Sequence, residues 1–236
     1  IYGIVGDGDL QEGISSESAS LAGTLGLGKL IYIYDSNGIS IDGSNDLAFT
    51  ENVAERFKSY NWHVIENING NDIKSIENAI EISKNELSKP SLIIADTTIG
   101  FGSPNKAGSE SAHGEPLGEE ETNLTRDNLG WDYGEFEVPE DVVKHMKQII
   151  TKGNILEKNW EKDAENFKSE NPDQYNNFLQ IMNNQYTENW DEELLNNIKN
   201  SNEPEATRAS SGFAINLISN SLDNLIGGSA DLTGST

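Results

Sequence analysis

The sequence predicts an α/β fold: a doubly wound parallel sheet, followed by a helical linker and the start of a second α/β domain. Three observations support this prediction. Through the first half of the chain, short apolar runs alternate with segments in which apolar residues recur at helical intervals. A glycine-rich turn joins the first apolar run to the first helical pattern. After Lys152 the composition becomes rich in Glu, Lys, Asn and Gln, until an apolar pattern resumes beyond Pro204.

The first forty residues predict a strand–helix–strand unit. Residues 1–5 form an apolar run, which a turn of glycine and aspartate follows. Residues 30–34 form a second apolar run, which ends at a turn over residues 35–38. Between the two runs, apolar residues recur at near-helical spacing, at Leu10, Ile14, Leu21 and Leu25. Such a unit implies two parallel strands joined by a right-handed crossover.

The same alternation continues along the chain. We predict further strands at residues 62–65, 91–95 and 225–226, and helices at residues 52–60, 72–87, 119–129, 140–150 and 208–221. The glycine-rich loop at residues 100–118 is too long to be an ordinary connection. We assign residues 1–151 to the first domain, 152–203 to a polar helical linker and 204–236 to the start of the second domain.

The chain is strongly acidic, with a formal net charge of -24 and a pI of about 4.3. Such a surface repels nucleic acid and anionic membranes, so we expect neither as a partner. The absence of cysteine excludes disulfides and thiolate chemistry, and no apolar run is long enough to span a bilayer. We expect a cytoplasmic protein. Because both ends interrupt structural patterns, we also expect the chain to be an internal segment of a longer protein.

Two turns of the strand–helix–strand unit carry oxygen ligands. Asp7 follows the first strand and Asn37 the second, and ligands of parallel sheets bind outside such strand ends. Mg²⁺ prefers carboxylate, amide and phosphate oxygens, and the carbonyl of Ile39 is a third candidate from the protein. Gly8 lets the backbone approach a diphosphate, whose charge the start of the following helix favours. We expect Mg²⁺ here, with Ca²⁺ or Mn²⁺ as alternatives.

Other ligand-binding loops fit these residues less well. A dinucleotide-binding loop needs a glycine three residues after Gly8, but the next glycine is Gly13. A P-loop needs Gly-Lys followed by Ser or Thr, which is absent. An EF-hand beginning at Asp35 would place Ile39 at a ligand position. An isolated Gly-Asp-Gly is most often a simple turn, and its pairing with Asn37 is what indicates a metal site here.

Residues 6–8 together with Asn37 resemble the thiamine diphosphate motif. Longer stretches resemble transketolases in the right order: GDGDLQEGIS at 6–15, ISIDG at 39–43, IGFGSPNKAG at 99–108, HGEPLG at 113–118, ATR at 206–208 and GSADL at 228–232. The resemblance runs along nearly the whole chain and is weakest across residues 152–200. It implies a thiamine diphosphate-binding fold, with a diphosphate-binding domain first and a pyrimidine-binding domain after the linker.

The resemblance implies a set of residues around the cofactor. The metal ligands would be the side chains of Asp7 and Asn37 and the carbonyl of Ile39. Thiamine diphosphate would contact Gly6, Asp7, Gly8, Asn37, Ile41, Ile99 and His113, with Ile41 against the thiazolium ring.

The resemblance also implies residues for the substrate and for a homodimer. His113 would contact the sugar, and an imidazole can move a proton near neutral pH. Arg208 and Ser235 would bind the phosphate of the sugar, to which arginine forms bidentate bonds. Asp231 would lie close to the cofactor and take part in catalysis. Glu12 and Glu17 would lie at the subunit interface.

Three positions depart from the family pattern. Asp9 stands where the family often has cysteine, and we expect little effect. Ser36 replaces the aspartate that commonly precedes Asn37. Glu110 stands where we expect a second histidine of the loop, and it adds negative charge where phosphates would bind.

The resemblance implies the transfer of a two-carbon ketol unit from a ketose phosphate to an aldose phosphate, as in the pentose phosphate pathway and the Calvin cycle. The glutamate that faces the aminopyrimidine in this family would lie beyond Thr236, so we expect no activity from these 236 residues alone. The alternatives are a deoxyxylulose-phosphate synthase, a dehydrogenase E1 component, or a non-catalytic metal- or diphosphate-binding protein. The loop of His113 and the presence of Arg208 favour a sugar phosphate.

Overall fold

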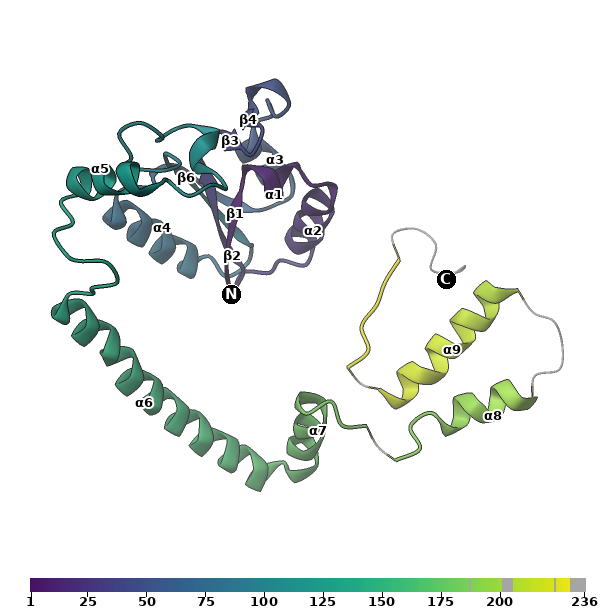
Figure 1. The fold of residues 1–236 in the computed structure, drawn as a ribbon. Helices are drawn as coiled ribbons and strands as arrows, with labels where there is room; N and C mark the ends of the chain where they lie inside the picture. The colour runs from purple at the N-terminus through teal and green to yellow at the C-terminus, as the bar shows by residue number, and fades with distance from the viewer. Residues whose placement is uncertain (187, 201–205, 223, 230–236) are drawn as a thin grey trace. The chain divides into compact units, whose positions relative to one another are not determined.

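The computed structural model describes residues 1–186, 188–200, 206–222 and 224–229. The chain separates into two units, residues 1–137 and residues 138–236. Figure 1 shows the sheet of the first unit and the helices of the second. The predicted boundaries at residues 151 and 203 stay a prediction.

The first unit is built on a parallel sheet with the strand order β1, β2, β6, β5. The strands are β1 (Tyr2–Gly6), β2 (Ile31–Ser36), β5 (His63–Asn69) and β6 (Ser91–Asp96). From β2 the chain crosses to the edge strand β5 and then returns to β6, which lies between them. The predicted α/β fold with a parallel sheet is therefore confirmed, although β5 extends beyond the predicted residues 62–65.

Helices cover both faces of this sheet because its central strands are apolar on both sides. The helices of the first unit are α1 (Asp7–Gln11), α2 (Gly13–Thr24), α3 (Val53–Ser59), α4 (Ile73–Asn85) and α5 (Glu119–Leu129). Tyr34 and Leu92 belong to the buried cluster formed with α2 and α3. Their neighbours Ile33 and Ile93 face the opposite cluster, which includes Ala79 of α4. Successive residues of one strand therefore pack into two different cores, one on each face of the sheet.

The helical pattern predicted after Gly8 is two helices instead of one. α1 ends at Gln11, and Glu12 has the extended backbone angles φ -69° and ψ 134°. The carbonyl of Asp9 accepts from the N–H of Glu12 at 3.4 Å and from the hydroxyl of Ser15, so it does not continue the α-helical ladder. The prediction of one continuous helix was therefore wrong at Glu12.

Three short elements and a long loop complete the first unit. A two-stranded antiparallel hairpin, β3 (Ile39–Ser40) and β4 (Gly43–Ser44), follows β2 and leads into the 3₁₀ turn η1 (Asn45–Leu47). The long loop after β6 contains a second 3₁₀ turn, η2 (Glu110–Ala112).

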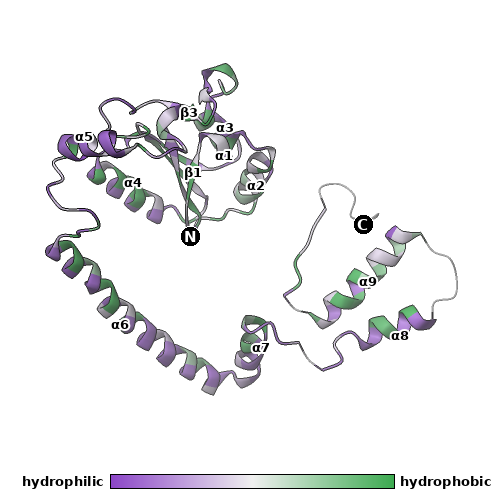
Figure 2. Cartoon of the chain, in the orientation of Figure 1, coloured by the Kyte–Doolittle hydropathy of each residue, from purple (hydrophilic) through white to green (hydrophobic). Residues whose placement is uncertain are grey.

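The second unit is helical in its described residues. It contains α6 (Glu140–Glu170), α7 (Pro172–Met182), α8 (Glu192–Asn200) and α9 (Thr207–Ser221). Figure 2 shows hydrophobic residues interspersed with hydrophilic ones along α6. The helix predicted at 140–150 continues to Glu170, because no proline interrupts it before Pro172.

The strand predicted at residues 225–226 was wrong. The N–H of Leu225 donates to the carbonyl of Leu222 at 3.2 Å, so a turn uses the group that a strand would need for its ladder. Separately, no helix among the described residues combines the length and the apolar content needed to cross a bilayer.

Candidate functional site

The carboxyl ends of β1 and β2 bring Asp7 and Asn37 together. The register pairs Gly6 with Asp35, so Asp7 leaves its strand at the level where β2 ends. The backbone N–H groups of Asn37 and Gly38 donate to Oδ2 of Asp7 at 3.3 and 3.0 Å. Oδ1 of Asn37 in turn accepts from the N–H of Ile39 at 3.0 Å. The turns that follow β1 and β2 are therefore hydrogen-bonded to each other, and they supply a carboxylate and an amide oxygen to the same edge of the sheet.

A buried tyrosine orients the carboxylate of Asp7. The hydroxyl of Tyr34 donates to Oδ1 of Asp7 at 2.5 Å, and both residues are buried. Burial raises the pKa of the Tyr34 hydroxyl, and the hydrogen bond to Asp7 raises it further, so the phenol stays a donor. With the two backbone donors, this bond fixes both oxygens of Asp7. Sequence reasoning missed Tyr34, although a tyrosine on a buried strand usually needs a hydrogen-bond partner.

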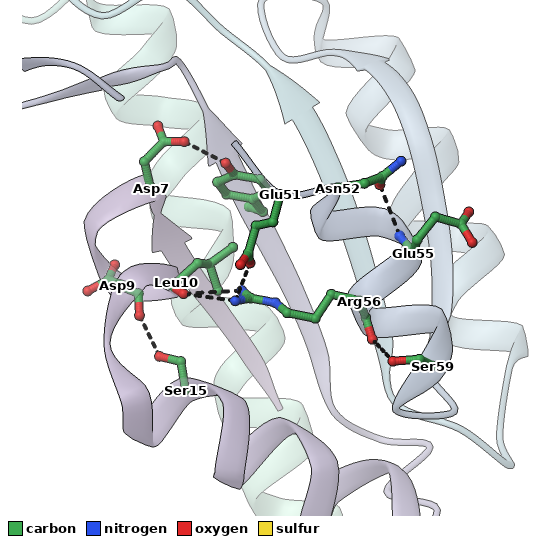
Figure 3. A network of polar contacts seen from close by, with 10 residues as sticks. Asp7, Asp9, Leu10, Ser15, Glu51, Asn52, Glu55, Arg56 and Ser59 are labelled. Atoms are coloured by element: carbon green, nitrogen blue, oxygen red, sulfur yellow. Dashed lines mark hydrogen bonds and ion pairs between the residues drawn. The ribbon is translucent and has the colours of Figure 1, made fainter. Parts of the chain in front are cut away.

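Arg56 ties the end of α1 to α3 (Figure 3). Its Nη1 and Nη2 donate to the carbonyl of Leu10 at 3.2 and 3.1 Å, and Nη1 also forms an ion pair with Glu51. The guanidinium lies 5.4 Å from the centre of the Phe57 ring, and the side chain is only 15% exposed. Arg56 thus satisfies a free carbonyl at a helix end. Sequence reasoning missed it, because nothing local separates it from other helical arginines.

A side chain of the turn that contains Asp7 also accepts a hydrogen bond from the backbone of the same turn. The N–H of Gly6 donates to Oδ2 of Asp9 at 2.8 Å. The departure from the family pattern at Asp9 therefore has a structural role, because its carboxylate caps the start of α1. A β-carbon at Gly8 would meet no atom within 4 Å, so the space beside this turn is open.

The donor set at Asp7 and Asn37 fits a magnesium ion that is shared with a diphosphate. Mg²⁺ takes about six oxygen ligands and is usually held by one or two carboxylates together with phosphate oxygens. Across the described parts of the chain, no three His, Cys, Asp or Glu side chains gather in a way that could hold a metal by themselves. Two protein side chains beside open space leave ligand positions for phosphate oxygens.

The other residues expected at the cofactor lie on the hairpin and the long loop. Ile39 lies in β3 and is half-buried, and Ile41 at the tip of the hairpin is 71% exposed. Ile99 is half-buried, and its carbonyl accepts from the N–H of Gly108 at 2.8 Å. His113 follows η2 and is exposed, and its N–H donates to the carbonyl of Glu110 at 2.9 Å.

The remaining predicted residues lie in several places. Glu12 and Glu17 are exposed on or beside α2, which also exposes Ile14 and Leu21. Arg208 is exposed in the first turn of α9, in the second unit. Asp231 and Ser235 lie outside the described residues.

Comparison with known proteins gives a consistent result. The family described as "Transketolase, thiamine diphosphate binding domain" matches residues 1–187. A transketolase of Buchnera aphidicola (subsp. Schizaphis graminum) is 47% identical over 232 residues, and transketolase 2 of Escherichia coli is 44% identical over 234 residues. These matches cover 97% and 98% of this chain.

Solved structures agree with these relatives. A transketolase from Leishmania mexicana matches with a TM-score of 0.89 at 37% identity over 99% of this chain. A transketolase from Pichia stipitis in complex with sedoheptulose 7-phosphate matches with a TM-score of 0.88 at 36% identity over 99% of this chain. The chain spans 35% of the length of the Buchnera and E. coli relatives, and 34% and 35% of the two solved chains.

Proposed function

We propose a function on one premise: this chain belongs to the transketolase family, whose thiamine diphosphate binding domain matches its residues 1–187. The protein that contains it transfers a two-carbon ketol unit from a ketose phosphate to an aldose phosphate. The relatives and solved structures above are named transketolases, which favours this activity over that of a deoxyxylulose-phosphate synthase, a dehydrogenase E1 component or a non-catalytic homologue.

The observation that carries the proposal is the joint placement of Asp7 and Asn37. Their turns adjoin, and the backbone of Asn37 donates to the carboxylate of Asp7. Within this proposal, the two side chains and the carbonyl of Ile39 hold one Mg²⁺ ion, for which Ca²⁺ or Mn²⁺ can substitute. Gly6 and Gly8 let the backbone approach the diphosphate, and the open space at Gly8 supports this role.

When bound, thiamine diphosphate supplies the carbanion chemistry that breaks and forms the carbon–carbon bonds. The residues of this chain bind and position it. Ile41 presents an exposed apolar side chain suited to the thiazolium ring, and Ile99 lines the cofactor site. His113 contacts both the diphosphate and the sugar, and moves a proton at the sugar hydroxyl.

The substrate and the second subunit involve residues further along the chain. Arg208 binds the phosphate of the sugar through its guanidinium. The roles proposed for Ser235 in binding the same phosphate, and for Asp231 in catalysis, fall on residues outside those that the structure describes. Glu12 and Glu17 lie at the interface of a homodimer, and the exposed apolar residues of α2 support an interface there. The acidic charge of the chain argues against nucleic-acid and membrane partners and agrees with a cytoplasmic protein.

A coupled assay of the full-length protein tests this function. Purified protein with thiamine diphosphate and Mg²⁺ should convert xylulose 5-phosphate and ribose 5-phosphate into a seven-carbon ketose phosphate and a three-carbon aldose phosphate. The conversion should require both the cofactor and the metal, so samples without thiamine diphosphate and samples with a chelator serve as controls. Failure to form both products with the complete mixture would reject the proposal.

A further inference from the structure

A single buried carboxylate joins the long loop after β6 to helix α5. Glu121 lies in the first turn of α5 and is only 8% exposed. The hydroxyl of Ser103 and the N–H of Asn105 both donate to its Oε1, the latter at 2.8 Å. The side-chain amide of Asn105 donates to its Oε2 at 2.8 Å. Both oxygens of Glu121 are thus bound to one short segment of the loop.

These three donors suit an ionised carboxylate. The hydroxyl of Ser103 is the main cause that lowers the pKa of the Glu121 carboxyl, and the two bonds from Asn105 lower it further. Lys106, the next residue of the loop, adds a favourable charge. Glu119 and Glu120 in the same turn of α5 are exposed, so Glu121 is the acidic residue of this turn that the loop encloses.

The contacts continue from Glu121 toward His113. Oγ of Ser103 also accepts from the N–H of Lys106 at 3.1 Å. The carbonyl of Lys106 accepts from the N–H and the hydroxyl of Ser109, at 3.3 and 2.8 Å. Ser109 precedes η2 and accepts from the N–H of Ala112 at 3.1 Å, and His113 is the next residue. Hydrogen bonds that are joined through the backbone of Lys106 and Ser109 therefore link Glu121 to the turn that presents His113.

The start of the loop makes further contacts with α5 and with η2. The side-chain amide of Asn128 donates to the carbonyl of Gly102 at 2.8 Å. A β-carbon at Gly102 would lie 2.7 Å from the side chain of Leu129, and one at Gly100 would lie 2.7 Å from Cβ of Ala112. The loop is thus packed against α5 at one point and against η2 at another.

We propose that Glu121 is a positioning residue, which holds the loop of residues 99–113 and so places the imidazole of His113 for the sugar phosphate. The proposal rests on the proposed function. Glu121 acts only through its hydrogen bonds to the loop and does not touch the substrate. Its loss should therefore weaken substrate binding more than it changes the turnover of bound substrate.

Three variants separate this role from a general effect of charge. Glu121→Ala removes all three acceptor contacts. Glu121→Gln removes the charge but keeps an oxygen for Ser103 and the N–H of Asn105, and the amide of Asn105 can turn its oxygen toward the new NH₂ group. Glu120→Ala is the matched control, because it removes an exposed carboxylate one residue earlier in the same helix.

Hydrogen–deuterium exchange of the full-length protein gives the first measurement. In Glu121→Ala the amides of Lys106, Gly108 and His113 should exchange about tenfold faster or more, as expected when a hydrogen bond to a charged group is lost. The strand amides of β6 should keep their protection. Glu121→Gln should show a smaller change, and Glu120→Ala none. Unchanged exchange in the loop of Glu121→Ala overturns the proposal.

Steady-state kinetics give the second measurement. The KM for the ketose phosphate should rise about tenfold in Glu121→Ala, with a smaller change in kcat, and Glu121→Gln should restore most of the difference. A mobile loop with an unchanged KM overturns the positioning role. If Glu121→Ala does not fold, Ser103→Ala, which removes one donor, should show the same pattern at reduced size, and wild-type behaviour there overturns the proposal.

The two measurements also separate this inference from the proposed function. If the wild-type protein transfers no ketol unit, the proposed function fails, and the role of Glu121 for the sugar phosphate fails with it. If the wild type is active and Glu121→Ala keeps both wild-type exchange and wild-type KM, only the inference about Glu121 fails.

Discussion

At the scale of single residues, the hydrogen bond from Tyr34 to Asp7 is the contact that most directly orients the candidate metal ligand. It joins two buried groups at 2.5 Å. Partners of this kind fix the orientation of a ligand without touching the metal, and their loss usually lowers metal affinity about 10- to 100-fold.

We therefore predict that Tyr34→Phe lowers the affinity of the full-length protein for Mg²⁺ in the presence of thiamine diphosphate by about tenfold or more. Titration calorimetry at fixed cofactor concentration measures this affinity. Tyr32→Phe is the control, because Tyr32 lies on the same strand and its ring packs beside Trp62 at a centroid distance of 6.2 Å. Equal Mg²⁺ affinities for wild type and Tyr34→Phe would show that the hydroxyl has no such role.

Glu121 also predicts a dependence on pH. Its hydrogen bonds lower the pKa of the carboxyl below the ordinary value of 4.5. A lowered pKa means that the ionised carboxylate contributes stability above pH 4.5, and this contribution is lost as the pH falls from there through the lowered pKa. The difference in loop protection between wild type and Glu121→Gln should thus shrink below pH 4.5. Exchange rates compared at several acidic pH values test this, and a constant difference would contradict it.

At the scale of elements, the close packing of α2 depends on one glycine. A β-carbon at Gly23 would lie 1.7 Å from the carbonyl oxygen of Tyr60. The indole N–H of Trp62 donates to the carbonyl of Ala19 at 2.8 Å, so α2 cannot move away without losing a buried hydrogen bond. This packing keeps α2 against the sheet whose strand ends carry Asp7 and Asn37.

Gly23→Ala should therefore destabilise the protein. Overpacking costs about 1–3 kcal/mol, and a contact of 1.7 Å with a backbone atom belongs at the upper end of this range, above the gain of at most about 1 kcal/mol from replacing glycine within a helix. Gly13→Ala is the matched control in the same helix, because a β-carbon there meets no atom within 4 Å. Thermal unfolding should show a lower Tm for Gly23→Ala and an unchanged or higher Tm for Gly13→Ala. Equal effects of the two substitutions would contradict this account.

The elements and the central pair could be predicted from sequence for a physical reason. Strands and helices have different apolar periods, and strand ends of a parallel sheet meet at one edge, so Asp7 and Asn37 were expected to be neighbours. Tyr34, Arg56 and Glu121 could not be found in this way. Their roles depend on partners 27, 46 and 16 to 18 positions away in the sequence.

Boundaries were predicted less well than elements, again for particular reasons. The helix after Gly8 divides at Glu12 because Ser15 donates to a backbone carbonyl within the pattern. Three consecutive glutamates begin α5, and only the folded loop distinguishes Glu121 from the other two. Glu121, Thr125 and Asn128 are spaced so that they lie on one face of the helix. This spacing is the sequence signal that could have indicated the role of Glu121.

At the scale of the whole molecule, charge is the main constraint on the proposed function. The chain carries a net charge of -24, yet the proposed cofactor and substrates are phosphorylated. Long-range repulsion therefore opposes their binding, and a divalent cation held at Asp7 and Asn37 offsets this repulsion where the diphosphate would lie. The affinity for the cofactor should therefore fall strongly when the metal is removed, because the charge repulsion is then no longer offset.

Calorimetric binding of thiamine diphosphate to the full-length protein, with and without Mg²⁺, tests whether Asp7 and Asn37 hold the metal. It compares wild type, Asp7→Ala and the control Asp127→Ala. Asp127 is exposed on α5, far along the sequence from Asp7 and Asn37, and its substitution removes the same charge. We expect Mg²⁺-dependent binding in wild type and Asp127→Ala, and a loss of affinity of more than about a hundredfold in Asp7→Ala, since even the outer partners of a metal ligand contribute about 10- to 100-fold. Wild-type affinity in Asp7→Ala would contradict this expectation.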